Sequence, residues 1–210
     1  MLFRSSQSYY EATANRNESY PSLVGDITAD VVVVGGGFTG LSAALELAEA
    51  GMKVVVLEAG RIGAGASGRN GGQLGTGQRR DEDELEARFG PGPARQLFDL
   101  GIEARQLTRE LIRTHRIDCD LTPGQIVCAA KPDHARGLRR RAEKKARDYG
   151  YPDQEVLSAP AMRRLVDSPL YHGGILDRGA AHLLPLNYAL GLARAAAAAG
   201  VRLHQHSAVT

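Results

Sequence analysis

The sequence contains no tryptophan and only two cysteines, Cys119 and Cys128, among its 210 residues. Two cysteines are too few for a disulfide framework. Their spacing in the sequence also lacks the partner residues that would complete a zinc site. We expect both to be small residues buried in a reducing compartment. The six histidines are scattered, and no grouping with Ser, Asp or Cys indicates hydrolytic or metal chemistry. The sequence therefore predicts no metal site, and it leaves the catalytic residues unidentified.

Long hydrophobic runs and an excess of either charge are also absent. No stretch approaches ~18 uncharged apolar residues, so we expect no membrane-spanning helix. The 26 basic and 24 acidic residues give a formal charge of +2, which calls for neither a nucleic acid nor an anionic membrane as partner. The first residues lack the apolar segment of a secretory signal. We expect a cytoplasmic protein.

Basic residues concentrate only in residues 133–148, where the pattern predicts a helix with an apolar edge of Leu138, Ala142 and Ala146. The other face carries Arg136, Arg139, Arg140, Arg141, Lys144, Lys145 and Arg147. A nucleic-acid patch is one interpretation of this face. A solvated helix face is favoured, because no aromatic residues stand between the charges.

The strongest pattern in the sequence is a strand, a helix and a strand within thirty residues. Residues 29–34 are a β-branched run that ends in glycines, which predicts a strand buried on both faces. Residues 38–50 are helix-forming throughout, and Gly51 ends that helix. Residues 53–57 predict a second buried strand. The three segments together predict a βαβ unit with parallel strands.

The turn between the first strand and the helix satisfies G-x-G-x-x-G. Gly35 permits the tight turn, Gly37 lets the backbone approach a pyrophosphate, and Gly40 allows helix and strand to pack closely. The first N–H groups of the helix then face the phosphates at the positive end of the helix dipole. Glu58 ends the second strand, where a carboxylate accepts hydrogen bonds from ribose hydroxyls and repels a 2′-phosphate. This context favours dinucleotide binding over a glycine turn with a purely structural role.

The segment after Glu58 favours FAD over NAD. A nicotinamide dehydrogenase would normally continue with a second helix and a third parallel strand. Here residues 59–72 contain six glycines and show no helical or strand period. Such a segment can run along a long ligand and donate backbone N–H groups to it. A flexible surface loop is the alternative, but Ser67, Arg69 and Asn70 add polar groups that a simple linker does not need.

The remaining pattern is less regular. Residues 81–115 predict helix with a break at 90–93, and residues 119–121 and 125–129 predict a hairpin joined by 122–124. Residues 150–185 are irregular, residues 186–199 predict helix, and residues 201–204 begin another strand. The chain stops at residue 210 just as this strand begins, so we expect a segment of a longer protein.

These residues resemble the D-amino-acid oxidase superfamily of FAD enzymes. The resemblance begins at Tyr9-Tyr10, is densest over residues 29–75 and returns at 184–203. It implies an α/β fold: a Rossmann-like FAD-binding domain with part of a discontinuous α+β substrate domain. The expected ranges are an N-terminal arm at 1–29, the FAD-binding domain at 30–114, part of the substrate domain at 115–185, and a return to the FAD-binding domain at 186–210.

The same resemblance implies FAD as cofactor and assigns FAD-contacting positions. They are Gly35, Gly36, Gly37, Phe38, Thr39, Gly40, Glu58, Ala59, Gly60, Arg61, Ser67, Gly68, Arg69, Asn70, Gly71, Gly72 and, beside the adenine, Val209. The implied reaction is oxidation of a small-molecule amine at the carbon that bears nitrogen. Gamma-glutamylputrescine is the favoured substrate. D-amino acids, glycine or sarcosine are alternatives, and a catalytically silent FAD-fold module is the alternative from another class.

Overall fold

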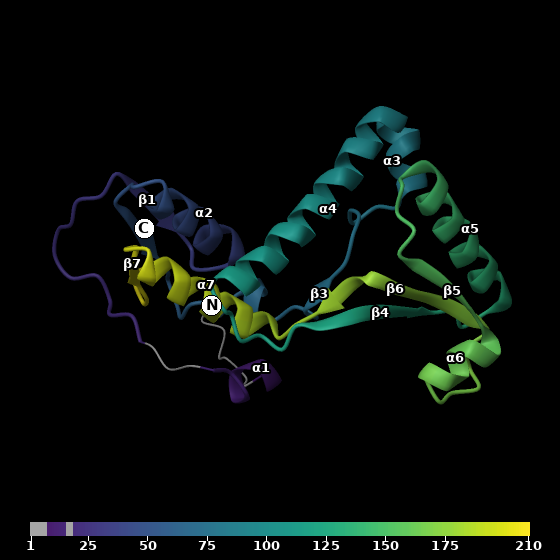
Figure 1. Cartoon of the computed structure of the whole chain (residues 1–210). Helices are drawn as coiled ribbons and strands as arrows, with labels where there is room; N and C mark the ends of the chain where they lie inside the picture. The colour runs from purple at the N-terminus through teal and green to yellow at the C-terminus, as the bar shows by residue number, and fades with distance from the viewer. Residues whose placement is uncertain (1–7, 16–18) are drawn as a thin grey trace. The chain divides into compact units, whose positions relative to one another are not determined.

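The computed structural model describes residues 8–15 and 19–210, which form two compact units (Figure 1). Unit 1 contains the described residues up to 72, together with residues 108–120 and 183–210. Unit 2 contains residues 73–107 and 121–182. The α/β class predicted from the sequence is confirmed. The unit boundaries differ from the expected domains, because residues 73–107 belong to unit 2 and residues 115–120 belong to unit 1.

Unit 1 is built on a three-stranded parallel sheet with the order β1-β2-β7. Its strands are β1 (Val31–Val34), β2 (Val54–Leu57) and β7 (Arg202–His204). Helix α2 (Phe38–Glu49) connects β1 to β2, whose register pairs Val31 with Val54 and Val34 with Leu57. The predicted βαβ unit with parallel strands is therefore confirmed.

Burial differs between the two strands of this unit. All of β2 except Leu57 is buried, as the sequence predicts. The prediction that β1 is buried on both faces is wrong, because Val32 is 55% and Val34 is 67% exposed. β1 lies at the edge of the sheet. Val33 faces α2, whereas Val32 and Val34 point to the opposite face, since successive side chains alternate along a strand.

Helix α7 (Pro185–Ala198) forms the centre of unit 1. Eleven of its residues are buried, and it packs against α2. The rings of Phe38 and Tyr188 lie 5.2 Å apart at this contact. A short helix, α1 (Tyr9–Ala12), is followed by Asn15, whose N–H donates to Asn187 Oδ1 of α7 at 3.0 Å. Residues 1–7 and 16–18 of the predicted arm lie outside the described residues.

Unit 2 contains an antiparallel sheet in which β6 (Gly173–His182) is the central strand. β6 pairs with β3 (Gln73–Leu74), β4 (Thr122–Cys128) and β5 (Gln154–Ser158). Figure 1 shows β4 and β6 side by side along most of their length, with the short helix α6 (Ala159–Leu165) at the far end of β6. The other helices are α3 (Glu82–Phe89), α4 (Pro91–Thr114), whose last turns belong to unit 1, and α5 (Pro132–Asp148).

Two expectations for unit 2 are wrong. The predicted hairpin at 119–129 is a single strand, β4, because Pro123 and Gly124 form an irregularity in its pairing with β6 and do not form a turn. Gly124 takes φ +90°, and β4 is an edge strand, where a proline without an N–H is tolerated. The segment 150–185 is not irregular but contains β5, α6 and β6. Of the break predicted at 90–93, only Gly90 separates the helices, because α4 begins at Pro91.

Helix α5 lies where the sequence predicts it, but its buried face is different. Ala142 and Lys145 are buried, whereas Ala146 is exposed. The assignment of Lys145 to the solvated face is therefore wrong. Its ammonium group lies 3.2 Å from the carboxylate of Glu82, which is also buried. A buried cation of this kind requires such a partner, and a helical period computed from hydrophobicity alone does not show it.

Unit 2 contains a buried aromatic cluster of Phe98, Tyr149 and Tyr151, and Tyr151 also belongs to a buried hydrogen-bond network. The Tyr151 hydroxyl donates to Asp177 Oδ1 at 2.6 Å and accepts from Arg105 Nη1 at 2.8 Å. Burial, followed by the bond to Asp177, raises the pKa of Tyr151 to about 12. The hydroxyl is therefore a neutral donor at physiological pH.

Replacing Tyr151 with phenylalanine is expected to lower the free energy of unfolding by about 1–3 kcal/mol, because it removes one partner from both Asp177 and Arg105 in a buried site. Urea-induced unfolding followed by circular dichroism measures the change. Tyr171→Phe is the matched control, since Tyr171 lies only partly buried in the same unit. Equal stability of Tyr151→Phe and the unsubstituted protein would show that the network contributes nothing.

The two cysteines are free thiols. Cys119 is buried as expected, and burial, with the charges of Asp118 and Asp120, raises its pKa to about 11. The expectation of burial is wrong for Cys128, which is half-buried with its sulfur 3.8 Å from that of Met162. Across residues 8–15 and 19–210, no three His, Cys, Asp or Glu side chains gather where they could hold a metal ion. None of the helices in these ranges combines the length and apolarity needed to cross a membrane.

Candidate cofactor-binding site

The glycine turn after β1 has the geometry that its pattern predicts. Gly35 takes φ +104°, and its N–H donates to Leu57 O on β2 at 2.8 Å. A Cβ atom at Gly40 would lie 2.1 Å from Gly35 O and 3.1 Å from Val33 Cγ1. Real Cβ atoms do not approach a backbone oxygen so closely. Gly40 is thus the residue that lets α2 begin directly against the end of β1.

The N-terminus of α2 opens at this turn. Its N-cap is Gly37, which has no side chain to cap the helix, and the Phe38 N–H donates instead to Ser67 Oγ at 3.0 Å. Ser67 comes from the loop after β2, so the loop and the turn are joined at the start of the helix. The N–H groups of the first turn and the positive end of the helix dipole favour an anion here.

Glu58 stands at the end of β2, beside the turn. Its Oε2 accepts from the Gly36 N–H and its Oε1 from the Gly60 N–H, each at 2.7 Å. These two bonds fix the orientation of the carboxylate. Each carboxylate oxygen accepts more than one hydrogen bond, so both retain capacity for a further donor such as a ribose hydroxyl.

The end of β7 and the residues after it form hydrogen bonds with the backbone of Glu58. The Glu58 N–H donates to His204 O, and the Glu58 carbonyl accepts from the Ser207 N–H, both at 2.9 Å. Gln205 is buried, and its Oε1 accepts from the Ile62 N–H at 2.9 Å. Gln205 was not predicted from the sequence. A polar residue directly after the strand predicted at 201–204 is the signal that could have identified it.

The glycine-rich loop at 59–72 is tied to the protein by its own polar groups. The Asn70 side chain donates to Ala66 O and Ser67 O and accepts from the Gly72 N–H at 2.8 Å, while Arg69 Nε donates to Ala64 O at 2.8 Å. A Cβ at Gly68 would lie 2.1 Å from Gly63 O, and one at Gly72 would lie 2.0 Å from Leu183 O. The loop therefore follows a defined path, which favours a ligand-lining segment over a flexible linker.

Several polar side chains of this loop bond to backbone atoms of the protein itself. Asn70, Ser67 and Arg69 each bond to backbone of the loop or turn, so part of the polarity that the sequence analysis assigned to a ligand stabilises the loop itself. Their contact with a cofactor stays a prediction. So do contacts from Ala59 and Gly71, which are both exposed.

Replacing Asn70 with alanine is expected to loosen residues 66–72 while leaving the core of unit 1 intact, because three loop hydrogen bonds depend on one side chain. Amide hydrogen exchange should accelerate in that segment and not in α7. Asn70→Asp is the matched variant: it keeps the acceptor for the Gly72 N–H and should show an intermediate effect. Unchanged exchange at 66–72 in Asn70→Ala would contradict this role.

Two of the predicted FAD-contacting residues, Arg61 and Val209, are exposed on the surface. Arg61 is exposed and forms an ion pair with Glu11 of α1, with Nη1 and Oε1 2.7 Å apart. Val209 lies two residues after Ser207, whose N–H donates to the Glu58 carbonyl, and is 56% exposed. The structure thus brings together the Gly35–Gly40 turn, Glu58 and the loop, and it leaves the adenine contact of Val209 as a prediction.

The assembled site fits the adenosine-diphosphate portion of a dinucleotide. The helix N-terminus supplies hydrogen-bond donors and positive potential for a pyrophosphate, and the oriented carboxylate of Glu58 supplies acceptors for a ribose. The glycines keep side chains away from the turn. No residue of the site is a nucleophile activated by a base, so its chemistry is that of binding.

The chain is similar to known proteins over most of its length. Residues 30–210 match the family model described as "FAD dependent oxidoreductase" (DAO). The chain is 47% identical to gamma-glutamylputrescine oxidoreductase of Escherichia coli over 97% of its length, and 40% identical to the probable oxidoreductase OrdL of Rhizobium meliloti over 94%. It spans 47% and 46% of these two relatives. Glycine oxidase from Geobacillus kaustophilus is similar in structure, with a TM-score of 0.66 and 27% identity over 85% of this chain and 46% of that one.

Proposed function

The chain belongs to the family of FAD-dependent oxidoreductases, and we propose that unit 1 holds the adenosine-diphosphate half of FAD in a protein that oxidises an amine.

One observation supports the binding residues more than any other. The carboxylate of Glu58 is fixed by the Gly36 and Gly60 N–H groups directly beside the N-terminus of α2. In this proposal Glu58 orients the ribose, while the N–H groups from Gly37 onward bind the pyrophosphate. The loop at 59–72, joined to the start of α2 through Ser67, would line the phosphate-binding end of this helix. FAD, when bound, supplies a flavin ring that accepts a hydride from the carbon bearing the amine nitrogen.

The substrate that the relatives favour is gamma-glutamylputrescine. The Escherichia coli relative that is 47% identical carries that compound in its name, and its match extends over both units. Glycine is a second candidate, since glycine oxidase is the structural neighbour with 27% identity. The third reading is a module that binds FAD and has no turnover.

A substrate panel separates these readings. The purified protein should be assayed for flavin reduction under anaerobic conditions with gamma-glutamylputrescine, putrescine, glycine, sarcosine and a D-amino acid. We expect the fastest reduction with gamma-glutamylputrescine. Faster reduction by glycine or sarcosine would assign the alternative substrate class, and bound flavin that none of the compounds reduces would overturn the amine oxidation.

A further inference from the structure

Residues 20–28, called the strap below, lie beside β7 and the turn that follows it in unit 1. Four side chains of β7 and this turn bond to main-chain atoms of the strap. The pairs are Arg202 with Thr28 O, His204 Nδ1 with Pro21 O at 3.2 Å, Gln205 Nε2 with Tyr20 O at 3.4 Å, and Ser207 Oγ with the Leu23 N–H at 2.9 Å. The strap is therefore held along its length by this one segment.

The same turn also holds the main chain of the proposed FAD site. His204 O accepts from the Glu58 N–H, and the Ser207 N–H donates to the Glu58 carbonyl, both at 2.9 Å. Between them, the His206 N–H donates to Gly60 O at 2.9 Å. His206 takes φ +52°, a conformation that costs energy in a residue with a side chain and persists where neighbouring bonds fix it.

Two side chains of the turn connect the strap to the FAD site. Gln205 is buried; its Oε1 accepts from the Ile62 N–H at 2.9 Å, while its Nε2 donates to Tyr20 O of the strap. The Ser207 hydroxyl accepts from the Leu23 N–H of the strap and donates to Gln205 O at 2.9 Å. The strap thus fixes the two residues that continue to the FAD site.

We propose that Gln205 and Ser207 are positioning residues through which the strap holds the carboxylate of Glu58 in place for the ribose of FAD. This proposal rests on the role in FAD binding proposed above for Glu58. The Gly60 N–H donates to Glu58 Oε1 at 2.7 Å, and Gly60 O is bonded to the turn. A turn released from the strap would therefore shift Glu58 and Gly60 together, and with them the carboxylate. Gln205 and Ser207 need not contact the cofactor.

Replacing Ser207 with alanine removes the bond to the strap and keeps the N–H that donates to Glu58. We expect the variant apoprotein to bind FAD roughly threefold to tenfold more weakly in an equilibrium titration, as for the loss of one neutral hydrogen bond. Ser207→Thr keeps a hydroxyl and should retain the affinity of the unsubstituted protein. Unchanged affinity in Ser207→Ala, or an equal loss in Ser207→Thr, would overturn the proposal.

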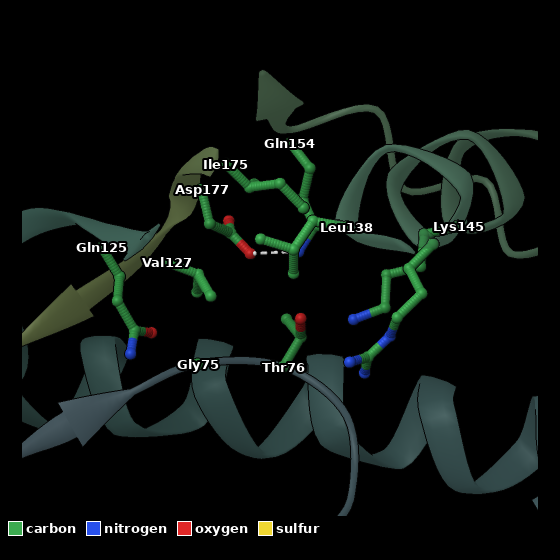
Figure 2. A pocket seen from close by; sticks show the side chains of 10 residues that line it. Gly75, Thr76, Gln125, Val127, Leu138, Lys145, Gln154, Ile175 and Asp177 are labelled. Atoms are coloured by element: carbon green, nitrogen blue, oxygen red, sulfur yellow. Dashed lines mark hydrogen bonds between the residues drawn. The ribbon is translucent and has the colours of Figure 1, made fainter. Parts of the chain in front are cut away.

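Gln205→Met and Gln154→Met are matched substitutions in the two units. Figure 2 shows Gln154 at a pocket of unit 2, where its Nε2 donates to Asp177 Oδ2 at 2.9 Å. Both substitutions remove an amide that forms hydrogen bonds, so both should lower the melting temperature. We expect only Gln205→Met to weaken FAD binding, by roughly tenfold. Equal affinities in the two variants would show that lower stability alone explains any loss, and would contradict the positioning role.

The double variant Glu58→Gln/Ser207→Ala distinguishes this proposal from the proposed FAD site. If Ser207 acts through Glu58, the double variant binds FAD no more weakly than Glu58→Gln alone, because the two losses do not add. Losses that add would overturn the positioning by the strap and leave the role of Glu58 intact. Unchanged affinity in Glu58→Gln itself would overturn the proposed site, and the positioning role with it.

Discussion

Replacing Gly37 with valine is expected to yield folded protein that retains no flavin. A Cβ atom at Gly37 would lie 2.8 Å from Ser67 Oγ, the atom that accepts from the Phe38 N–H, so the side chain displaces Ser67 and breaks that bond. The two branches of valine also occupy the space at the N-terminus of α2 where the pyrophosphate is proposed to approach. The ratio of visible flavin absorbance to protein absorbance measures the loss.

Gly137→Ala is the control for this substitution. Gly137 lies in α5, where a Cβ atom meets nothing within 4 Å, so this variant should keep its full flavin content. Circular dichroism of both variants shows whether each is folded. A folded Gly37→Val protein that purifies with full flavin occupancy would mean that the phosphate does not approach the backbone at this turn.

Replacing Glu58 with glutamine is expected to weaken FAD binding by about 10- to 150-fold. A charge-assisted hydrogen bond to a ribose hydroxyl contributes about 1.5–3 kcal/mol, and the neutral amide loses this contribution. The structure adds a second effect. An amide has only one acceptor atom, so either the Gly36 or the Gly60 N–H would face an NH₂ group in place of an oxygen. Unfolding should therefore also become easier, by about 1–3 kcal/mol.

Equilibrium titration of the apoprotein with FAD measures the first effect, and denaturant unfolding of the same apoprotein measures the second. Glu46→Gln is the matched control, because Glu46 is an exposed carboxylate of α2 in the same unit. It should change neither quantity. A Glu58→Gln protein with the FAD affinity of the unsubstituted protein would show that Glu58 does not contact the ribose.

The parts of the fold that could be predicted from the sequence are those in which local pattern and burial agree. The βαβ unit at 29–57 is an example, because β-branched runs, a helix-forming stretch and glycines at the turns all indicate the same structure. The hairpin was predicted wrongly because Pro123-Gly124 is a turn signal in isolation. Pairing with β6, about fifty residues farther along, turned these residues into a bulge within a strand, and local sequence carries no information about that pairing.

The same distinction applies to the candidate site. The glycines and Glu58 could be identified because the spacing of the motif reflects backbone geometry. Gln205 could not, because its role depends on β7 lying beside β2, a contact between segments that are far apart in sequence. The burial of Lys145 likewise depends on Glu82 from another helix. The roles of Gln205 and Lys145 depend on tertiary contacts, and the hydrophobic periodicity of the sequence does not reveal such contacts.

A crystal structure of the protein purified with FAD tests the central claim most directly. We expect the pyrophosphate oxygens to lie within hydrogen-bonding distance of the N–H groups at the start of α2, and the ribose hydroxyls to donate to the carboxylate of Glu58. We also expect Glu58 to keep its bonds to Gly36 and Gly60 in the complex. An adenosine-diphosphate portion bound elsewhere, with the Gly35–Gly40 turn in contact with solvent alone, would contradict the proposed binding site.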